Sequence, residues 1–471
     1  LLYNVCMRPR ITDKTFYKYL KCPSWISHEM AADGHFRDPL LERLQDDGML
    51  KGKELELLKD RAVEEVTLDD IDEATQKTIE LMKQGVETIY RGVLIHEHWV
   101  AQPDILERVE GNSEFGDWYY VACDMKRSRH LKDEYKFQGS FYAEILSNIQ
   151  GVKPVNGYIL RADKSVESYS VEEFETQFHL TLDAIEDILD GNKEAHFLTS
   201  SCKQSPFFSE CTQEALACED LSVINRIWRK EMHALEDAGI GTIELLANAS
   251  VDDLSKVQDI TMDRLYFLQQ QAISHADNKV IRMGEIDLPE EDGVALVVDI
   301  ESDPLRDADY LFGVLLVKGD EQTYHAFLAK DPSEEERAWL DFIEFLKPYI
   351  SANLYHYGWY EEEVFRRMGE KYGVPDDVKK MFEENMIDVL VRMREKVIFP
   401  MSFYSLKDVA KFMGFSWRHP EASGLNSVLW YDKWIVDGDK QALQDIVDYN
   451  EDDVRATWLV RNWAITESNG P

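Results

Sequence analysis

The chain has 471 residues, of which 90 are acidic and 52 are basic, giving a formal net charge of −38 at pH 7. This length is too great for one hydrophobic core and predicts two or three domains. Acidity on this scale indicates a well-solvated surface and excludes broad adhesion to nucleic acid through overall charge. A nucleic-acid enzyme of this composition would have to gather its basic residues in one groove. The run from Lys126 to Lys136 is the candidate, and a solvated charged loop explains it equally well.

The apolar content of the chain sets the expected compartment. No run of 18 apolar residues is present, and the opening LLYNVCMRPR is too short and too polar for a signal peptide. We therefore expect an intracellular, cytoplasmic protein with no membrane association. Its six cysteines are then expected to be free or metal-bound rather than paired in disulfides.

The first part of the chain begins with helical patterns and continues into strands. A helix with a Thr/Asp cap is predicted from Ile11, and a long helical stretch follows it. A strand-rich segment then contains an acid and, one strand later, a second acid and a lysine two positions apart, which strand alternation places on one face. The residues of this series are Glu56, Asp104, Asp124, Lys126, Gln138 and Tyr142.

This order of residues, with CDMKRSR and QGSFYAEIL as its most specific pieces, resembles the PD-(D/E)xK nucleases, in particular the RecB family. The resemblance implies a restriction-endonuclease-like domain that binds Mg²⁺ or Mn²⁺. Asp104 and Asp124 would bind the metal, and Glu56, where the family often has His, would add a ligand. Lys126 would polarise the attacking water or the phosphate, while Gln138 and Tyr142 would brace the site. Each feature alone is frequent by chance, so the hypothesis rests on their shared order.

The cysteines add a second part to this resemblance. Some RecB-like nucleases hold a [4Fe-4S] cluster with one early cysteine and a late C-x-x-C-x(5)-C. Cys22 matches the early position, and Cys202 and Cys211 match two of the late ones. Ser205 stands where the middle cysteine is expected, although thiolates are the usual cluster ligands. Either Cys218 substitutes for it, or the site is degenerate and its thiols are inert.

Residues 223–285 have a helical pattern. The turn that contains Gly239 and Gly241 lies between two amphipathic segments and resembles a helix-hairpin-helix. That resemblance implies backbone N–H groups that bind DNA phosphates without reading sequence. A plain helical linker is the alternative, because Glu236 and Asp237 make the flank acidic.

The third part of the chain opens with the strand Val294–Asp303. This apolar, β-branched run ends in Asp299 and Glu301, which strand alternation projects from one side. Two carboxylates held together repel each other, and hard oxygen ligands of this kind suit Mg²⁺ or Mn²⁺. Further along, Glu361 opens a predicted helix. A last helix then carries Tyr449 and Asp453 four positions apart, hence on one face.

This second series resembles the DnaQ-like 3′-to-5′ exonucleases of the RNase H-like superfamily, in which four carboxylates hold two metal ions. The resemblance assigns metal binding to Asp299, Glu301 and Asp453, and orientation of the attacking water to Tyr449. Glu361 stands where the family usually has Asp, so its side chain is longer than expected. Asp388 is read as supporting the site rather than binding metal. The late tryptophans, expected to pack in the core rather than to stack on bases, are Trp417, Trp430 and Trp434.

The whole chain resembles a family of predicted RecB-like nucleases. The expected class is α/β, with a PD-(D/E)xK domain at 1–222, a helix-hairpin-helix-like segment at 223–285 and an RNase H-like exonuclease domain at 286–471. The resemblance implies phosphodiester hydrolysis in DNA processing or repair, with DNA preferred to RNA as the partner. Related architectures precede a helicase, and no Walker A motif is present here, so any helicase would be a separate partner or a missing C-terminal part. The alternative is a nucleic-acid-binding scaffold whose nuclease sites have decayed.

Overall fold

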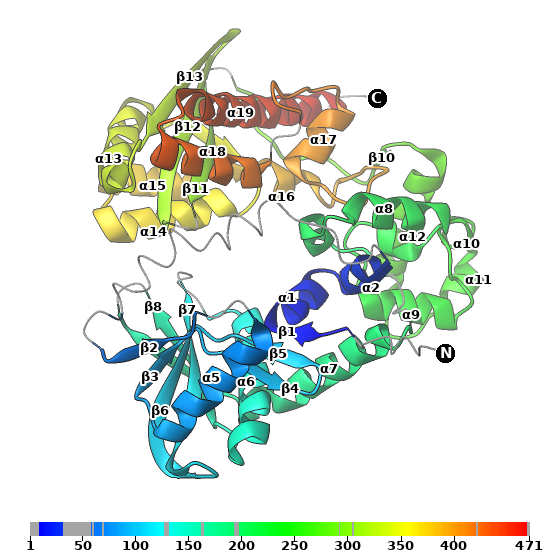
Figure 1. Ribbon diagram of the computed structural model, residues 1–471. Helices are drawn as coiled ribbons and strands as arrows, with labels where there is room; N and C mark the ends of the chain where they lie inside the picture. The colour runs from blue at the N-terminus through cyan, green and yellow to red at the C-terminus, as the bar shows by residue number, and fades with distance from the viewer. Residues whose placement is uncertain are drawn as a thin grey trace. The chain divides into compact units, whose positions relative to one another are not determined.

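The computed structural model describes residues 9–31, 58, 61–67, 70–126, 131–161, 164–192, 197–291, 293–303, 306–420 and 423–468. The chain divides into two compact units, Leu1–Gln213 and Glu214–Pro471 (Figure 1). The mixed α/β class expected from the sequence is confirmed. Glu56, expected to bind metal, lies outside the described residues. Within the described ranges, no helix is both long and apolar enough to span a bilayer.

The first unit is built on a six-stranded mixed sheet in the order β2-β3-β6-β7-β8-β9, and it also contains a three-stranded sheet in the order β1-β5-β4. Its strands are β1 (Ile11–Thr12), β2 (Val63–Glu65), β3 (Thr88–Tyr90), β4 (Leu94–His96), β5 (Trp99–Ala101), β6 (Ile105–Ser113), β7 (Gly116–Lys126), β8 (Asn156–Arg161) and β9 (Val166–Ser170). Its helices are α1 (Asp13–Lys21), α2 (Pro23–Ala31), α5 (Ile71–Gln84), α6 (Asp133–Gln150), α7 (Glu175–Leu189) and, at the boundary between the units, α8 (Phe208–Ala217). Its described part also contains two short 3-10 helices, η1 (Glu172–Phe174) and η2 (Ser200–Gln204).

The helix predicted from Ile11 is split into α1 and α2 by its own sequence. Pro23 has no N–H and disfavours a helical conformation in the residue before it. Cys22 is accordingly extended, with φ −158° and ψ 106°, and Pro23 starts the second helix. The break places Cys22 in a turn instead of in the middle of a helix.

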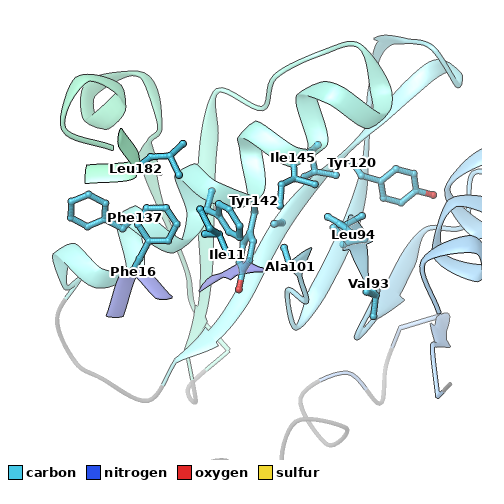
Figure 2. Close-up of a cluster of buried hydrophobic side chains, with 14 of the residues drawn as sticks. Ile11, Phe16, Val93, Leu94, Ala101, Tyr120, Phe137, Tyr142, Ile145 and Leu182 are labelled. Atoms are coloured by element: carbon cyan, nitrogen blue, oxygen red, sulfur yellow. The ribbon is translucent and has the colours of Figure 1, made fainter. Parts of the chain in front are cut away.

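The core of the first unit lies between the sheets and the helices α6 and α7 (Figure 2). Aromatic rings hold α1 onto this core, because the Phe16 ring contacts those of Phe137, Phe141 and Phe178 with centroid separations of 5.2 to 6.1 Å. Aromatic contacts of this kind add stabilisation beyond the area they bury. The first turn of α1, which contains Asp13, is therefore held close to α6.

The second unit contains a helical segment and a five-stranded sheet with its covering helices. The helical segment consists of η3 (Leu221–Val223), α9 (Arg229–Asp237), α10 (Ile243–Ala247), α11 (Val251–Leu254) and α12 (Met262–Asp277). The strand β10 (Ile281–Arg282), just after α12, pairs antiparallel with β16 (Val397–Ile398). The side chain of Asn225 also donates to the carbonyl of Ser402 at 2.8 Å. The helical segment is thereby tied to the rest of its unit.

The five-stranded sheet has the order β13-β12-β11-β14-β15. Strand β11 pairs antiparallel with β12 and parallel with β14, which in turn pairs parallel with β15. The strands are β11 (Val294–Asp303), β12 (Ala308–Lys318), β13 (Glu321–Leu328), β14 (Asn353–His356) and β15 (Met386–Asp388). The helices are α13 (Glu335–Leu346), α14 (Tyr360–Tyr372), α15 (Asp376–Glu384), α16 (Val389–Met393), α17 (Leu406–Phe412), α18 (Gly424–Asp437) and α19 (Lys440–Ser468), with the 3-10 helices η4 (Pro332–Glu334) and η5 (Lys347–Tyr349).

Strand alternation gives this sheet two different apolar faces. Leu296, Val298 and Ile300 belong to the core that contains α13, α14 and α15. Ala295 and Val297 belong to the opposite core, which contains residues of α16, α17 and α19. Because side chains two apart in a strand share a face, the residues that follow Val297 on this second face are Asp299 and Glu301. An apolar column thus ends in two carboxylates beside α19.

Candidate active sites

Three carboxylates converge in the second unit. Asp299 and Glu301 come from the end of β11, and Asp453 comes from α19. One oxygen from each side chain lies within 4.8 Å of the other two, close enough for all three to hold one cation. Glu301 and Asp453 are 5 % and 8 % exposed, whereas Asp299 is only partly buried. The structure thus brings Asp453 next to two predicted ligands, Asp299 and Glu301, that lie about 150 residues earlier in the chain.

The neighbours of α19 fix two of these carboxylates. Asn450 donates its side-chain N–H to Oδ2 of Asp299 at 2.7 Å, and Tyr324 donates its hydroxyl to Oδ1 of the same Asn450 at 2.7 Å. Trp417 donates its indole N–H to Oδ1 of Asp453 at 2.6 Å. These contacts leave the remaining carboxylate oxygens to bind a cation while limiting side-chain rotation.

A glycine on the neighbouring strand makes the Asn450 contact possible. Gly313 lies directly opposite Asp299 in the β11–β12 pairing. A Cβ at this position would overlap Oδ1 of Asn450 and lie 2.9 Å from the hydroxyl of Tyr324. The glycine in the YLFGV stretch is thus required by the close approach of α19, not by its own backbone angles.

Burial and mutual repulsion dominate the electrostatics of this group. Burial raises the pKa of Asp299 well above its ordinary value, and the charges of Asp453 and Glu301 raise it further. Burial followed by the Asp453 charge raises the pKa of Glu301 to about 8, and burial raises that of Asp453 to about 7. Repulsion among desolvated carboxylates is relieved by a divalent cation, and an all-oxygen donor set suits Mg²⁺ or Mn²⁺. The residues present therefore fit such an ion.

Glu361, the fourth predicted ligand, is buried in the first turn of α14. Its charge contributes to the raised pKa values of Asp299 and Glu301, so it lies near the group. Its Oε2 is 3.6 Å from Nδ1 of His356, a fully buried imidazole that also contacts the Gly358 carbonyl at 2.7 Å. The longer side chain thus faces a histidine as well as the other acids.

Asp388 occupies a structural position beside the His356 loop. Its Oδ1 accepts from Gly358 N and from Val391 N, both at 3.1 Å, and the second contact caps the short helix α16. Asp388 thereby fixes the loop that leads into α14 and Glu361.

Aromatic rings and one lysine complete the surroundings of the carboxylates. Tyr449 hydrogen-bonds Asp453, and burial together with the neighbouring acids raises the Tyr449 pKa, so its hydroxyl stays protonated. Lys407 Nζ lies 5.0 Å from the Tyr449 ring centre and 5.6 Å from that of Trp417. Burial lowers the Lys407 pKa, although the nearby Asp453 opposes this shift. Of the three late tryptophans, Trp417 is buried, with 4 % of its surface exposed, while Trp430 and Trp434 pack partly buried against the cores.

The first unit holds a second candidate site at the ends of β6 and β7. Asp104 directly precedes β6, and Asp124 lies in β7, so the antiparallel pairing sets the two acids side by side. Asp104 N donates to Oδ1 of Asp124 at 3.4 Å, and Met125 N donates to Oδ2 of Asp104 at 2.7 Å. Nζ of Lys126 lies 3.1 Å from Oδ2 of Asp124. Burial disfavours the charged lysine, but the two carboxylates outweigh it and raise the Lys126 pKa.

Helices α6 and α1 cover this second site. Gln138 and Tyr142 both come from α6, and the Tyr142 pKa is raised well above its ordinary value by burial and then by the Asp124 charge. Gln138 donates its side-chain N–H to Oδ2 of Asp13 at 2.9 Å. Burial, followed by the Asp124 charge, raises the pKa of Asp13. Asp13 is therefore a further acid near Asp124, whereas its place in the sequence predicted only a helix cap.

The remaining predicted positions lie elsewhere. Cys22, Cys202 and Cys211 are buried in the first unit, as is Ser205, while Cys218 is exposed just after α8. Gly239 lies in the loop after α9 with φ +84°, a conformation that favours glycine, and Gly241 lies two residues further on. Thr242 caps the next helix, α10, by accepting from Leu245 N.

Sequence reasoning missed Asp13, Asn450, Gly313 and Lys407. Asn450 follows Tyr449 directly in the YNEDD stretch, so its proximity to Asp453 was visible, but the strand that it reaches was not. Gly313 and Asp13 carried no local signal, because their roles depend on the approach of α19 and α6.

Comparison with known families finds a match within the second unit. Residues 296–465 match the family model described as the RNase_H superfamily. The matched range begins in β11 and ends in α19, so it contains all three converging carboxylates. No curated protein matches the chain. The match supports an RNase H-like domain in the C-terminal part of the chain, which suggests a fold of the nuclease type.

Proposed function

We propose that the chain is a metal-dependent nuclease that hydrolyses phosphodiester bonds of DNA, at ends or in single strands, during DNA processing or repair. The observation that carries this proposal is the convergence of Asp299, Glu301 and Asp453 inside the RNase H-like domain. An exonuclease site of the DnaQ-like type is the form that the Y-x-x-x-D spacing of Tyr449 and Asp453 favours.

In this proposal the three carboxylates and Glu361 hold Mg²⁺ or Mn²⁺. Such ions, when bound, generate a nucleophile from water and stabilise the leaving oxygen. Asn450 and Trp417 hold Asp299 and Asp453 in the orientation that binding requires. The neutral Tyr449 hydroxyl is hydrogen-bonded to Asp453, and its oxygen can accept a hydrogen bond from the attacking water.

Exposed aromatic groups beside this site suit a single strand. The Trp359 side chain is 72 % exposed and lies two residues before Glu361. The neighbouring Tyr360 donates its hydroxyl to Oγ of Ser302, at 2.7 Å, next to Glu301. Its ring meets that of Trp359 edge-on at 5.9 Å. Exposed rings of this kind stack on bases without reading sequence.

For the first unit we propose a second nuclease centre of the PD-(D/E)xK type, within the expected domain 1–222. Asp104 and Asp124 would supply carboxylate oxygens for a divalent ion, and Lys126 would polarise a phosphate or a water. The helical segment around Gly239 and Gly241 would contact DNA phosphates, and a helicase would be a separate partner.

The scaffold alternative has one observation in its favour. The Lys126 ammonium already pairs with Asp124, so the acid that should bind a metal has a partner inside the protein. This pairing would suit a first unit that binds DNA without cutting it.

The test uses purified protein with a 5′-labelled DNA single strand, with and without Mn²⁺. We expect Asp299→Asn and Asp124→Asn each to remove part of the cleavage and the double variant to remove all of it. Glu336→Gln, an exposed carboxylate of α13, is the charge-matched control. Unchanged cleavage in the Asp299→Asn protein would overturn the proposal for the RNase H-like domain. Unchanged cleavage in Asp124→Asn alone would favour the scaffold role of the first unit.

A further inference from the structure

The ammonium of Lys407 lies beside the C-terminal acids but pairs with none of them. Its Nζ is 5.0 Å from the ring centre of Tyr449 and 5.6 Å from that of Trp417. Both rings belong to side chains that hydrogen-bond Asp453. The charge of the ammonium interacts with those of Asp453 and Glu301. Among the residues that the structure describes, however, its Nζ has no salt-bridge or hydrogen-bond partner, so its three N–H donors are open to a ligand.

The fold fixes this position from the backbone and from the side chain. Lys407 lies near the start of α17, where Ser405 caps the helix by accepting from Asp408 N at 3.3 Å. The next turn of α17 buries Val409 and Ala410 in the core that it shares with α19 (Figure 1). At the other end of the side chain, the negative faces of two aromatic rings attract the ammonium. The cation is therefore held at the edge of the acidic group without entering it.

Other cations near the two candidate sites already have carboxylate partners. Arg418, the residue after Trp417, forms salt bridges of 3.1, 3.0 and 2.9 Å with Asp448, Glu451 and Asp452. In the first unit, Nζ of Lys126 lies 3.1 Å from an acid of its own site. Lys407 differs from both, although the chain has 90 acidic residues with which a lysine could pair. Its lack of a protein partner points to a ligand with a negative charge.

The chemistry of a phosphodiester fits this place. The ammonium lies beside acids that, in the proposed function, hold a divalent cation. Two neighbouring positive charges repel each other unless an anion lies between them. A phosphodiester group has two non-bridging oxygens on one phosphorus atom, so it can face a cation on each of two sides. Lysine binds phosphate as a point charge with several rotatable donors, which requires no exact orientation of the substrate.

We propose that Lys407 is a catalytic residue of the RNase H-like domain, and that its ammonium donates to a non-bridging oxygen of the phosphodiester that is cut. This inference rests on the proposed nuclease function and adds a residue that contacts the substrate. The ammonium would hold the phosphate in the complex and stabilise the negative charge that develops on its oxygens. A purely structural lysine, which only offsets the charge of Asp453, would change the affinity for Mn²⁺ and would not respond to the charge of the substrate.

The first test is the salt dependence of binding of a labelled, short oligothymidylate to the full chain, with Ca²⁺ in place of Mn²⁺. One phosphate contact on a single strand adds about 0.7 to the slope of log Kd against log salt concentration. Lys407→Gln should therefore lower the slope by about 0.7 and weaken binding about 10-fold. Lys407→Arg should keep the slope. The matched control is Lys318→Gln, because Lys318 also lies over a ring, that of Tyr349 at 5.4 Å, but at the opposite end of β12. An unchanged slope in Lys407→Gln would overturn the proposal.

The second test identifies the oxygen atom that Lys407 contacts. The probe is the same oligothymidylate with a methylphosphonate at its 3′-terminal linkage, separated into two stereoisomers that each lack one non-bridging oxygen. The unmodified strand should bind the wild type about 10-fold more tightly than it binds Lys407→Gln. The isomer that lacks the contacted oxygen should bind both proteins equally. If both isomers still distinguish the two proteins as well as the unmodified strand does, Lys407 does not contact this phosphate.

Cleavage in Mn²⁺ separates this inference from the proposed function. We expect Lys407→Gln to lower kcat about 100-fold, as the loss of one donor to a developing charge does, and Lys407→Arg to restore part of it. If the wild type cleaves and Lys407→Gln cleaves equally fast, the inference fails while the nuclease proposal stands. A wild type that does not cleave would refute the nuclease proposal, and the two binding tests would then decide whether Lys407 binds phosphate. Melting temperatures and Mn²⁺ titrations guard against unfolding, and a loss of Mn²⁺ affinity that explains the whole fall in rate would show a structural lysine instead.

Discussion

The two candidate active sites are both carboxylate groups on a strand end, but they balance their charge differently. In the RNase H-like domain, Asp299, Glu301 and Asp453 face one another with neutral partners such as Asn450 and Trp417. In the first unit, Lys126 pairs with Asp124 inside the site. In the first site the nearby Lys407 offsets burial only in part, so the pKa of Asp453 stays raised. In the second site an ammonium pairs directly with one of the acids. Buried like charges raise carboxylate pKa values, and an adjacent ammonium opposes this effect.

The strongest test of the difference between the two sites is to remove one acid from each. Asp299→Asn should lower the Mn²⁺-dependent cleavage by its domain by more than about 100-fold, because even residues that only orient metal ligands cost about 10- to 100-fold. The measurement is the initial rate on a labelled single strand in an Asp124→Asn background, which silences the other site. An equal loss of cleavage in Glu336→Gln would mean that removing any one carboxylate charge from the protein lowers the rate.

A second variant tests whether neutral partners hold the C-terminal acids. Gly313→Ala should displace Asn450 from Asp299 and reduce cleavage by about 10- to 100-fold. Gly293→Ala is the control, since a Cβ there meets nothing within 4 Å. Melting temperatures measured alongside separate a local effect from unfolding. Normal cleavage by Gly313→Ala would show that the Asn450 contact is dispensable.

A third variant concerns substrate contact. In the described part of the first unit no aromatic side chain is strongly exposed, whereas Trp359 projects beside the C-terminal acids. Trp359→Ala should raise KM for a single strand about 10-fold, with kcat little changed, because one stacked base contributes about 1–3 kcal/mol. Trp359→Phe should retain most of the affinity. Leu340→Ala, an exposed apolar side chain of α13, should leave KM unchanged.

The smallest expected effect is on stability against pH. The raised pKa values of Glu301, about 8, and Asp453, about 7, mean that the native state keeps protons that the unfolded state has released. The free energy of unfolding should therefore fall as pH rises from about 4 to about 8. Melting curves in EDTA should show this fall. Mn²⁺, or the paired change Glu301→Gln with Asp453→Asn, should flatten it, and an equally steep fall in that double variant would refute the assignment.

Sequence patterns predicted the parts of the site that follow from local periodicity. Alternation along a strand placed Asp299 with Glu301, and helical spacing placed Tyr449 with Asp453. What joined the two pairs was the resemblance to a family, since no local pattern says that α19 crosses β11. The position of Asp13 could not be predicted, because it follows from the aromatic packing of α1 on α6. The need for glycine at position 313 could not be predicted either, because it comes from the Asn450 side chain, 137 positions away.

The helix α19 has one further consequence. Tyr449, Asn450 and Asp453 lie on a single unbroken helix of 29 residues, whose later turns are anchored in the core through Val460 and Ala464. Such a rod has no joint at which these side chains could swing independently. A nucleic acid would therefore have to bind to side chains that are already fixed in place. In the proposed nuclease, the rate of cleavage would then depend on how the strand end reaches these acids rather than on any movement of the acids toward it.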